Sequence, residues 1–268
     1  MGAVAAEVGE ASFLARAPRR PELAPFVEQL WVFRTPGFGH HLERIVPDGR
    51  AQLLVNLAED ELRTWDAGRP RRFAGSVLEG PFDHPFVIDT SQQRAILGVN
   101  LTLTGVGGWL PAGEVVGRRV DLHALGLPRI RESLVDAPTD AARLDRIEDA
   151  LARVFEAARE DRAMVAAARA LAGGVRVGAV HARLGMSART FQRRFRRQVG
   201  LGPKRFARVR RIQALLARLD GANDWSGLAH ELGFSDQAHL VREFRALTGV
   251  TPTAYAPRAS GDRNHIVL

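Results

Sequence analysis

The sequence predicts an α+β fold: a β-rich, barrel-like domain with a helical tail in the N-terminal half, and an all-α domain in the C-terminal half. Before Ser91, short strand-like segments alternate with turns rich in proline and glycine. After position 138, apolar residues recur every three or four positions, as they do in amphipathic helices. We therefore expect a sensor or dimerisation domain at 1–138, a linker helix at 139–160 and a second domain at 161–268.

The distribution of charge supports the same division. Residues 1–160 hold 19 basic and 23 acidic side chains, whereas residues 161–268 hold 19 basic and 7 acidic ones. The C-terminal part therefore carries a net charge of +12 within a chain whose total is +8. A positive field of this density attracts polyanions, of which nucleic acid is the commonest.

Composition excludes several other classes of protein. A chain of 268 residues that is 46% apolar can bury one large core or two modest ones. The absence of cysteine excludes disulfides, thiolate zinc sites, iron–sulfur clusters and cysteine nucleophiles. No apolar run approaches the roughly 20 residues that span a membrane, and the chain through Ala17 does not resemble a signal peptide. We expect a cytoplasmic, nucleoid-associated protein with no membrane partner.

In the N-terminal half, β-branched and aromatic residues gather in short runs. These runs predict strands at 26–33, 52–57, 61–65, 86–89 and 95–101. Pro47-Asp48-Gly49 is a predicted turn. Helical character then begins, with helices predicted at 106–110, 127–135 and 139–159.

The helix predicted at 139–159 has one apolar face that needs a cover. The residues of this face recur at helical spacing and are Leu144, Ile147, Leu151, Val154 and Phe155. The face can pack against its own domain, or it can form a seam between two copies of the chain. The sequence leaves both the monomer and the homodimer open.

From position 161 the pattern is helical throughout. Turn and capping residues separate helices predicted at 163–171, 177–184, 188–199, 203–219, 227–232 and 236–248. Ser187 and Ser235 are predicted N-caps, and Pro203 and Pro252 stand in first-turn positions.

An internal repeat links two of these stretches. Residues 184–206 match residues 232–255, at an offset of 48 for the first few residues and 49 for the rest. The matched residues are Leu184, Gly185, Ser187, Phe191, Phe195, Gly200, Pro203 and Phe206 with Leu232, Gly233, Ser235, Leu240, Phe244, Gly249, Pro252 and Tyr255. A helix, a glycine turn and a capped second helix make up the helix-turn-helix motif. The chain therefore contains two predicted units of a DNA-binding motif.

Each capped helix has an outward face that can read bases. With the apolar pair of each unit in the core, eight residues face outward: Arg189, Gln192, Arg193 and Arg196, then Gln237, Ala238, Val241 and Arg242. Arginine can pair with guanine and glutamine with adenine in the major groove. The second set is less charged, so we expect it to make fewer hydrogen bonds and more contacts with thymine methyls.

The helix predicted at 203–219 separates the two units. Its 17 residues span about 25 Å, which places the recognition helices near one DNA turn apart, roughly 34 Å. Arg205, Arg208 and Arg211 form a basic row that is either a solvated face or a set of phosphate contacts. We predict phosphate contacts at Ser187, Arg205, Arg208 and Ser235.

With these motifs in place, residues 163–255 resemble the AraC/XylS family of bacterial transcription regulators. The matching stretches are SARTFQRRF, GFSDQAHLVREF and the paired Gly-x-x-Pro ends. The resemblance implies a double helix-turn-helix domain that binds promoter DNA and acts on RNA polymerase, without catalysis or a cofactor. One departure is His181, where the family usually has a small residue, as Ala229 is in the second unit. His181 should widen the angle between the helices or turn outward.

The upstream half is similar to the cupin-like or barrel sensor domains attached in this family. The matching features are a Leu-Trp-Val strand, the Pro47 turn and the helical tail. No binding residue transfers with this likeness. It implies only that a small-molecule effector is a candidate partner, and Trp31, Trp65 and Trp109 are candidate pocket residues or core residues.

Two other functions fit parts of the sequence. A metal-dependent cupin enzyme is suggested by His40, His41, Glu43 and His84, although adjacent histidines on a strand point to opposite faces. An effector-free interaction protein that uses the barrel alone leaves the basic C-terminal half unexplained. The sequence lacks the Gly-x-Ser-x-Gly and Walker A motifs of common enzymes, so we expect neither a catalytic residue nor a bound metal.

Overall fold

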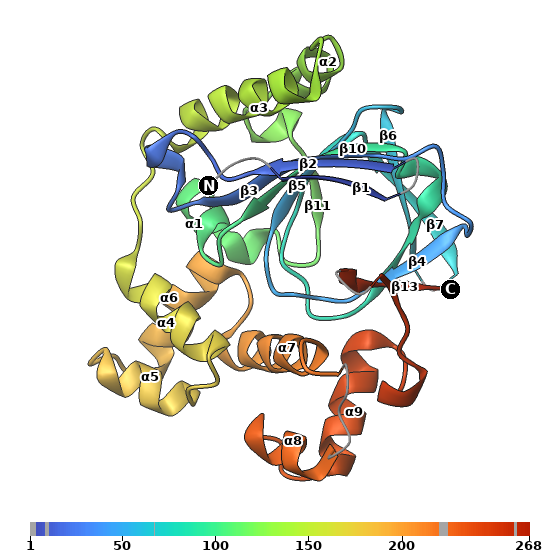
Figure 1. The fold of residues 1–268 in the computed structure, drawn as a ribbon. Helices are drawn as coiled ribbons and strands as arrows, with labels where there is room; N and C mark the ends of the chain where they lie inside the picture. The colour runs from blue at the N-terminus through green and yellow to red at the C-terminus, as the bar shows by residue number, and fades with distance from the viewer. Residues whose placement is uncertain (1–3, 9–10, 67, 220–224, 260–261) are drawn as a thin grey trace.

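The computed structural model describes residues 4–8, 11–66, 68–219, 225–259 and 262–268 (Figure 1). Two antiparallel sheets build the N-terminal part. The seven-stranded sheet has the order β1 (Val4–Val8), β2 (Ala11–Arg16), β3 (Val27–Arg34), β10 (Ala95–Leu101), β5 (Gln52–Asn56), β8 (Ser76–Glu79) and β11 (Arg119–Asp121). The six-stranded sheet has the order β12 (Pro257–Ala259), β13 (Asp262–Val267), β4 (Leu42–Ile45), β9 (Phe86–Asp89), β6 (Glu61–Asp66) and β7 (Arg69–Ala74).

The mixed fold predicted from the sequence is confirmed, with two refinements. The domain predicted to be all-α at 161–268 also contains β12 and β13, which join the smaller sheet. In the described residues the two sheets remain open and do not close into a barrel. Each strand predicted in the N-terminal half corresponds to one in the structure, with ends that differ by at most one residue. Among the strands that were not predicted, β7 has its first four residues exposed and its last two half-buried.

The N-terminal core lies between the large sheet and three helices. These are α1 (Gly105–Trp109), α2 (Ile130–Val135) and α3 (Asp140–Phe155), with short 3-10 turns at Pro21–Leu23, Thr90–Gln92, Ala112–Glu114 and His123–Leu125. Leu144, Ile147 and Leu151 of α3 are buried in this core, and the ring of Phe155 stacks on Phe26 with centroids 4.7 Å apart. The apolar face of α3 is therefore covered by its own domain.

The C-terminal half contains six α-helices in its described residues. They are α4 (Arg162–Ala172), α5 (Val177–Arg183), α6 (Ala188–Val199), α7 (Pro203–Leu216), α8 (Trp225–Glu231) and α9 (Gln237–Thr248), followed by a 3-10 turn at Pro252–Ala254. Their core contains the fully buried rings of Phe191, Phe195, Phe206 and Phe244. The Phe195 ring lies 5.5 Å from those of both Phe191 and Phe206, so aromatic contacts join the first unit to α7.

Several helix ends differ from the sequence predictions. Helix α2 begins at Ile130 rather than 127, and α3 ends at Phe155 rather than 159. Helix α7 ends at Leu216 rather than 219, and Ala217 is its C-cap. Its 14 residues span about 21 Å. Helix α9 is capped by Asp236, one residue after the predicted Ser235, because the Asp236 carboxylate accepts a hydrogen bond from the His239 backbone N–H at 2.6 Å. The predicted helix 227–232 corresponds to α8.

The N-terminal and C-terminal parts pack together at several places, and Figure 1 shows two of them, α6 beside α1 and α7 beneath the sheets. At the first, α6 packs on α1 and on the turn Ala112–Glu114. A Cβ at Gly107 of α1 would lie 2.6 Å from the Cα of Gln198, so only glycine permits this approach. At the second, the turn Pro47-Asp48-Gly49 lies on α7.

Candidate DNA-binding surface

The first recognition helix, α6, presents the predicted residues to solvent. Its N-cap Ser187 accepts a hydrogen bond from the Thr190 backbone N–H at 3.2 Å, and its opposite face is buried through Phe191, Phe195 and Val199. The four residues predicted to read bases are all exposed: Arg189, Gln192, Arg193 and Arg196. Three arginines and one glutamine therefore share one accessible helix face, although Arg196 also lies against Gly113 of the N-terminal domain.

The second recognition helix, α9, is organised in the same way but is less charged. Leu240, Phe244 and Leu247 are buried. Of the predicted residues, Gln237, Ala238 and Arg242 are exposed, whereas Val241 is half-buried against the core. The three exposed residues lie together, and Val241 offers less surface than the sequence suggested.

The predicted phosphate contacts have different surroundings. Ser187 and Ser235 are exposed at the starts of the two recognition helices, and the Ser235 hydroxyl contacts Asp236 and His239. The hydrogen bond from the His239 backbone N–H lowers the pKa of Asp236. A charged carboxylate therefore caps α9 where α6 has a neutral hydroxyl.

The arginine row of α7 makes contacts within the protein. Arg205 pairs with Asp83 of the N-terminal domain at 3.2 Å, and Arg208 pairs with Glu243 of α9. The Arg211 guanidinium lies 5.2 Å from the centre of the Phe234 ring. The side chains of Arg205 and Arg208 are 69% and 40% exposed, so each still reaches the surface.

Each recognition helix is braced by an ion pair at the same position of the repeat. Arg194 of α6 forms a two-pronged pair with Asp161, the N-cap of α4, at 2.9 and 3.0 Å. Glu243 of α9 occupies the equivalent position, 49 residues later, and pairs with Arg208 of α7. Neither pair was predicted from the sequence. The repeat offset brings the two positions into register, but their partners on other helices come from tertiary structure.

His181 is accommodated at the turn of the first unit. Its ring is half-buried, its Nδ1 lies 3.1 Å from the Met186 carbonyl oxygen, and its ring centre is 6.2 Å from that of Phe191. The imidazole is therefore directed towards the turn and the Phe191 ring and not outward, which was one of the two expected outcomes.

The histidines considered as metal ligands do not converge. His40 Nε2 lies 2.6 Å from Glu43 Oε1, whereas His41 is exposed and His84 stands near a separate pocket. Among the described residues, no group of three or more histidine, aspartate and glutamate side chains is arranged to hold a metal ion. The residues present therefore lend the metal-dependent cupin no support.

Glu43 is the centre of a different cluster, which joins the two halves of the chain. Its carboxylate is fully buried and accepts hydrogen bonds from His265 Nδ1 at 2.6 Å and from Arg258 Nη1 at 3.0 and 3.1 Å. Burial alone would raise the pKa of Glu43, but the bonds from His265, the charge of Arg258 and the bond from His40 together lower it to about 2. The carboxylate is therefore charged although no water reaches it.

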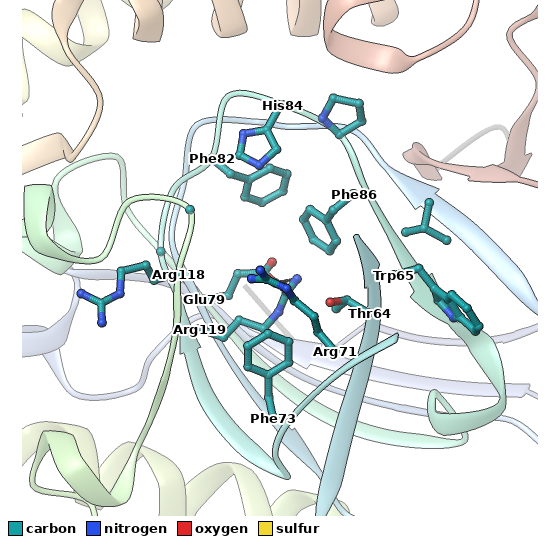
Figure 2. A pocket seen from close by; sticks show the side chains of 14 residues that line it. Thr64, Trp65, Arg71, Phe73, Glu79, Phe82, His84, Phe86, Arg118 and Arg119 are labelled. Atoms are coloured by element: carbon teal, nitrogen blue, oxygen red, sulfur yellow. Dashed lines mark ion pairs between the residues drawn. The ribbon is translucent and has the colours of Figure 1, made fainter. Parts of the chain in front are cut away.

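A pocket of about 400 Å³ lies in the N-terminal domain (Figure 2). Phe73, Phe82 and Phe86 point into it, and Arg119 lies 4.3 Å from the centre of the Phe86 ring. Arg119 also pairs with the buried Glu79. Trp65 lines this pocket, whereas Trp31 and Trp109 lie elsewhere, so the three tryptophans do not form one site.

Comparisons with known proteins agree with the helical motifs. Residues 180–258 match a family model described as a helix-turn-helix domain, and residues 16–115 match one described as a domain of unknown function (DUF6597). No curated protein matches the sequence. The C-terminal part is therefore a helix-turn-helix domain of the AraC type, which confirms the resemblance seen in the sequence.

Similar solved structures include ToxT from Vibrio cholerae bound to an unsaturated fatty acid. It is 12% identical, with 84% of this chain and 90% of that chain covered and a TM-score of 0.40. A second ToxT structure is 11% identical, with coverages of 91% and 95% and a TM-score of 0.38.

Every helix in the described part of the protein is too short or too polar to cross a membrane.

The charged state of Glu43 predicts a pH-dependent stability. Because its folded pKa lies below its ordinary value of 4.5, Glu43 stabilises the fold above that value and loses this contribution as pH falls towards 2. The Glu43→Gln variant should lack a contribution of up to about 3 kcal/mol at pH 7. Urea unfolding at pH 7, 4 and 2.5 should show the wild-type advantage shrinking. A constant difference across this range would contradict the charged cluster.

Proposed function

We propose that the protein is a one-component transcription regulator whose helices α6 and α9 read adjacent major grooves of promoter DNA. The observation that carries this proposal is the pair of capped helices, each with an exposed polar face, in a domain with a net charge of +12. Arginine and glutamine on such a face can form paired hydrogen bonds with guanine and adenine. Exposure makes these side chains accessible without any rearrangement of the helices.

The length of α7 supports simultaneous reading. Its span of about 21 Å, with the widths of the flanking helices added, is compatible with the roughly 34 Å between successive major grooves on one face of DNA. Bound in this way, the protein would either recruit RNA polymerase to the promoter or block its access to the promoter. Activation and repression both follow from the same DNA contacts.

A second element of the proposal is control by a small molecule in the pocket of Figure 2. Its wall carries three phenylalanines, Arg71 and the pair of Arg119 with Glu79, which favours a molecule with an apolar or aromatic body and an anionic group placed near Arg71. The loop that forms part of this wall also touches the DNA-binding domain. Asp83 pairs with Arg205, and a Cβ at Gly200 would lie 2.6 Å from Pro81. A ligand that moves this loop would therefore move the corner between α6 and α7.

DNA binding should depend steeply on salt. Each phosphate that the basic domain neutralises releases counterions, so affinity for a duplex selected by the wild-type protein from a random library should fall at least about tenfold between 50 and 200 mM salt. Fluorescence anisotropy at four salt concentrations measures the slope. An affinity that does not change with salt, or the absence of any selected duplex, argues against the proposal.

Single substitutions should separate base reading from phosphate binding. Arg193→Ala should cost about 1–3 kcal/mol on the selected duplex and relax the preference at one base pair. Arg208→Ala should lower the affinity for all duplexes alike. Arg208 is expected to contact a phosphate or to hold α9 through Glu243, and neither contact depends on the base sequence. Arg153→Ala, on the exposed end of α3, is the control and should bind as the wild type does. Equal losses for Arg193→Ala on every sequence would refute its role in base reading.

The pocket should bind negatively charged ligands more tightly than neutral ligands of the same shape. In a thermal-shift panel, aromatic and short aliphatic carboxylates should raise the melting temperature more than the amides of the same shape. Arg71→Gln should remove this difference, because it takes a positive charge from the pocket wall. Arg69→Gln, on the same strand but outside the lining, is the matched control. Equal shifts for carboxylates and amides would exclude an anion-selective site.

A further inference from the structure

The C-terminal segment returns from the DNA-binding domain to the N-terminal sheet. After the second helix-turn-helix unit, β12 and β13 form a hairpin, and β13 pairs antiparallel with β4 in the register His265 with Ile45 and Val267 with Glu43. We call β12 and β13 together the C-terminal hairpin. It supplies two of the six strands of the smaller sheet, which would otherwise end at β4.

The hairpin is held by the buried carboxylate of Glu43. Two of the three side chains that bond this carboxylate, Arg258 and His265, belong to the hairpin. A carboxylate away from water is costly unless it is paired. Undocking the hairpin would leave His40 as the one remaining partner of these three, so the cluster specifies the register in which the hairpin docks.

The same hairpin is bonded to α7. The Asn264 carbonyl accepts a hydrogen bond from the Val46 backbone N–H at 2.8 Å, and its side-chain oxygen accepts one from Gln213 Nε2 at 2.8 Å. Gln213 Nε2 also donates to the Pro47 carbonyl at 2.8 Å. Ile266 and Val46 are buried in the core of the C-terminal domain. The hairpin therefore lies between β4 and α7, the helix that leads into the second unit.

The first unit has its own, separate attachment. The C-terminal end of α6 packs on α1 and on the turn Ala112–Glu114, through Gly107 and Gly113. Neither glycine lies near the hairpin in the chain, and they approach α6 rather than α9. Both units are thus attached to the N-terminal domain, each at a different place.

We propose that the C-terminal hairpin is a positioning latch, which holds the second helix-turn-helix unit on the N-terminal sheet so that both recognition helices are preset for one DNA duplex. Glu43, Arg258 and His265 are positioning residues in this device. Presetting lowers the ordering cost of binding with both units at once. The proposal rests on the DNA-binding function proposed above, but the latch itself can be measured without DNA.

The first arm of the test measures backbone hydrogen exchange in the full chain without DNA. Arg258→Ala removes one latch partner, and Ile266→Ala weakens the apolar side of the hairpin, so the test does not depend on a single variant. Val267→Thr, whose side chain is exposed, is the control. We expect exchange in 42–45 and 237–248 to rise at least about fivefold in both variants, with 188–199 unchanged. An equal rise in both units, or no rise, would overturn the latch.

The second arm measures binding to the selected duplex and to versions with either half-site scrambled. Arg258→Ala should bind the intact duplex about tenfold more weakly, and its footprint should fade over the half-site of α9 but not over that of α6. Arg258→Lys should restore much of the loss. Unchanged or tighter binding would overturn the positioning role. If the wild type selects no duplex while the exchange pattern holds, the latch stands and the proposed function fails.

Discussion

The whole arrangement depends on helix α7, which must bury side chains on several sides at once. Phe206 and Val209 are fully buried, and the turn at Gly49 lies directly on them, at 3.4 and 3.5 Å from a Cβ placed there. Gly49 has a φ of +78°, a backbone conformation that glycine adopts without strain. The turn at Gly49, in the N-terminal domain, therefore packs against the core of the C-terminal domain. The two domains share a packed boundary.

Polar groups at this boundary reinforce the same attachment. Arg210 of α7 donates to the Asp48 carbonyl at 3.1 Å, and its burial, together with the nearby Arg50, lowers the pKa of Arg210. Gln213 bonds both the Pro47 turn and the C-terminal hairpin. Several of the basic groups that make the C-terminal half positive are thus engaged inside the protein. The base-reading faces of α6 and α9 remain open to solvent.

The helix-turn-helix units could be predicted from sequence because their determinants are local. Apolar spacing, glycine turns and caps all lie within about 20 residues of one another, and α6 begins and ends where these signals place it. Asp236 was missed as a cap because Ser235 beside it is an equally good one, although the repeat offset of 49 points to Asp236. The charged pairs of Arg194 and Arg208 were missed because their partners lie on other helices.

The N-terminal sheets were predicted only in part, because strand pairing is set by contacts between distant residues. β4 and β13 lie more than 200 residues apart, and each is short and polar when read alone. The same distance explains why Glu43 was read as a candidate metal ligand. Its true partners, Arg258 and His265, are brought to it only by the return of the hairpin.

The central claim, that one rigid scaffold presents two recognition helices to a single duplex, is tested most directly by hydroxyl-radical footprinting of the wild-type protein on its selected DNA. The account predicts two protected patches on the same face of the helix, with centres about 10–11 base pairs apart. A single patch, or two patches on opposite faces, would contradict it.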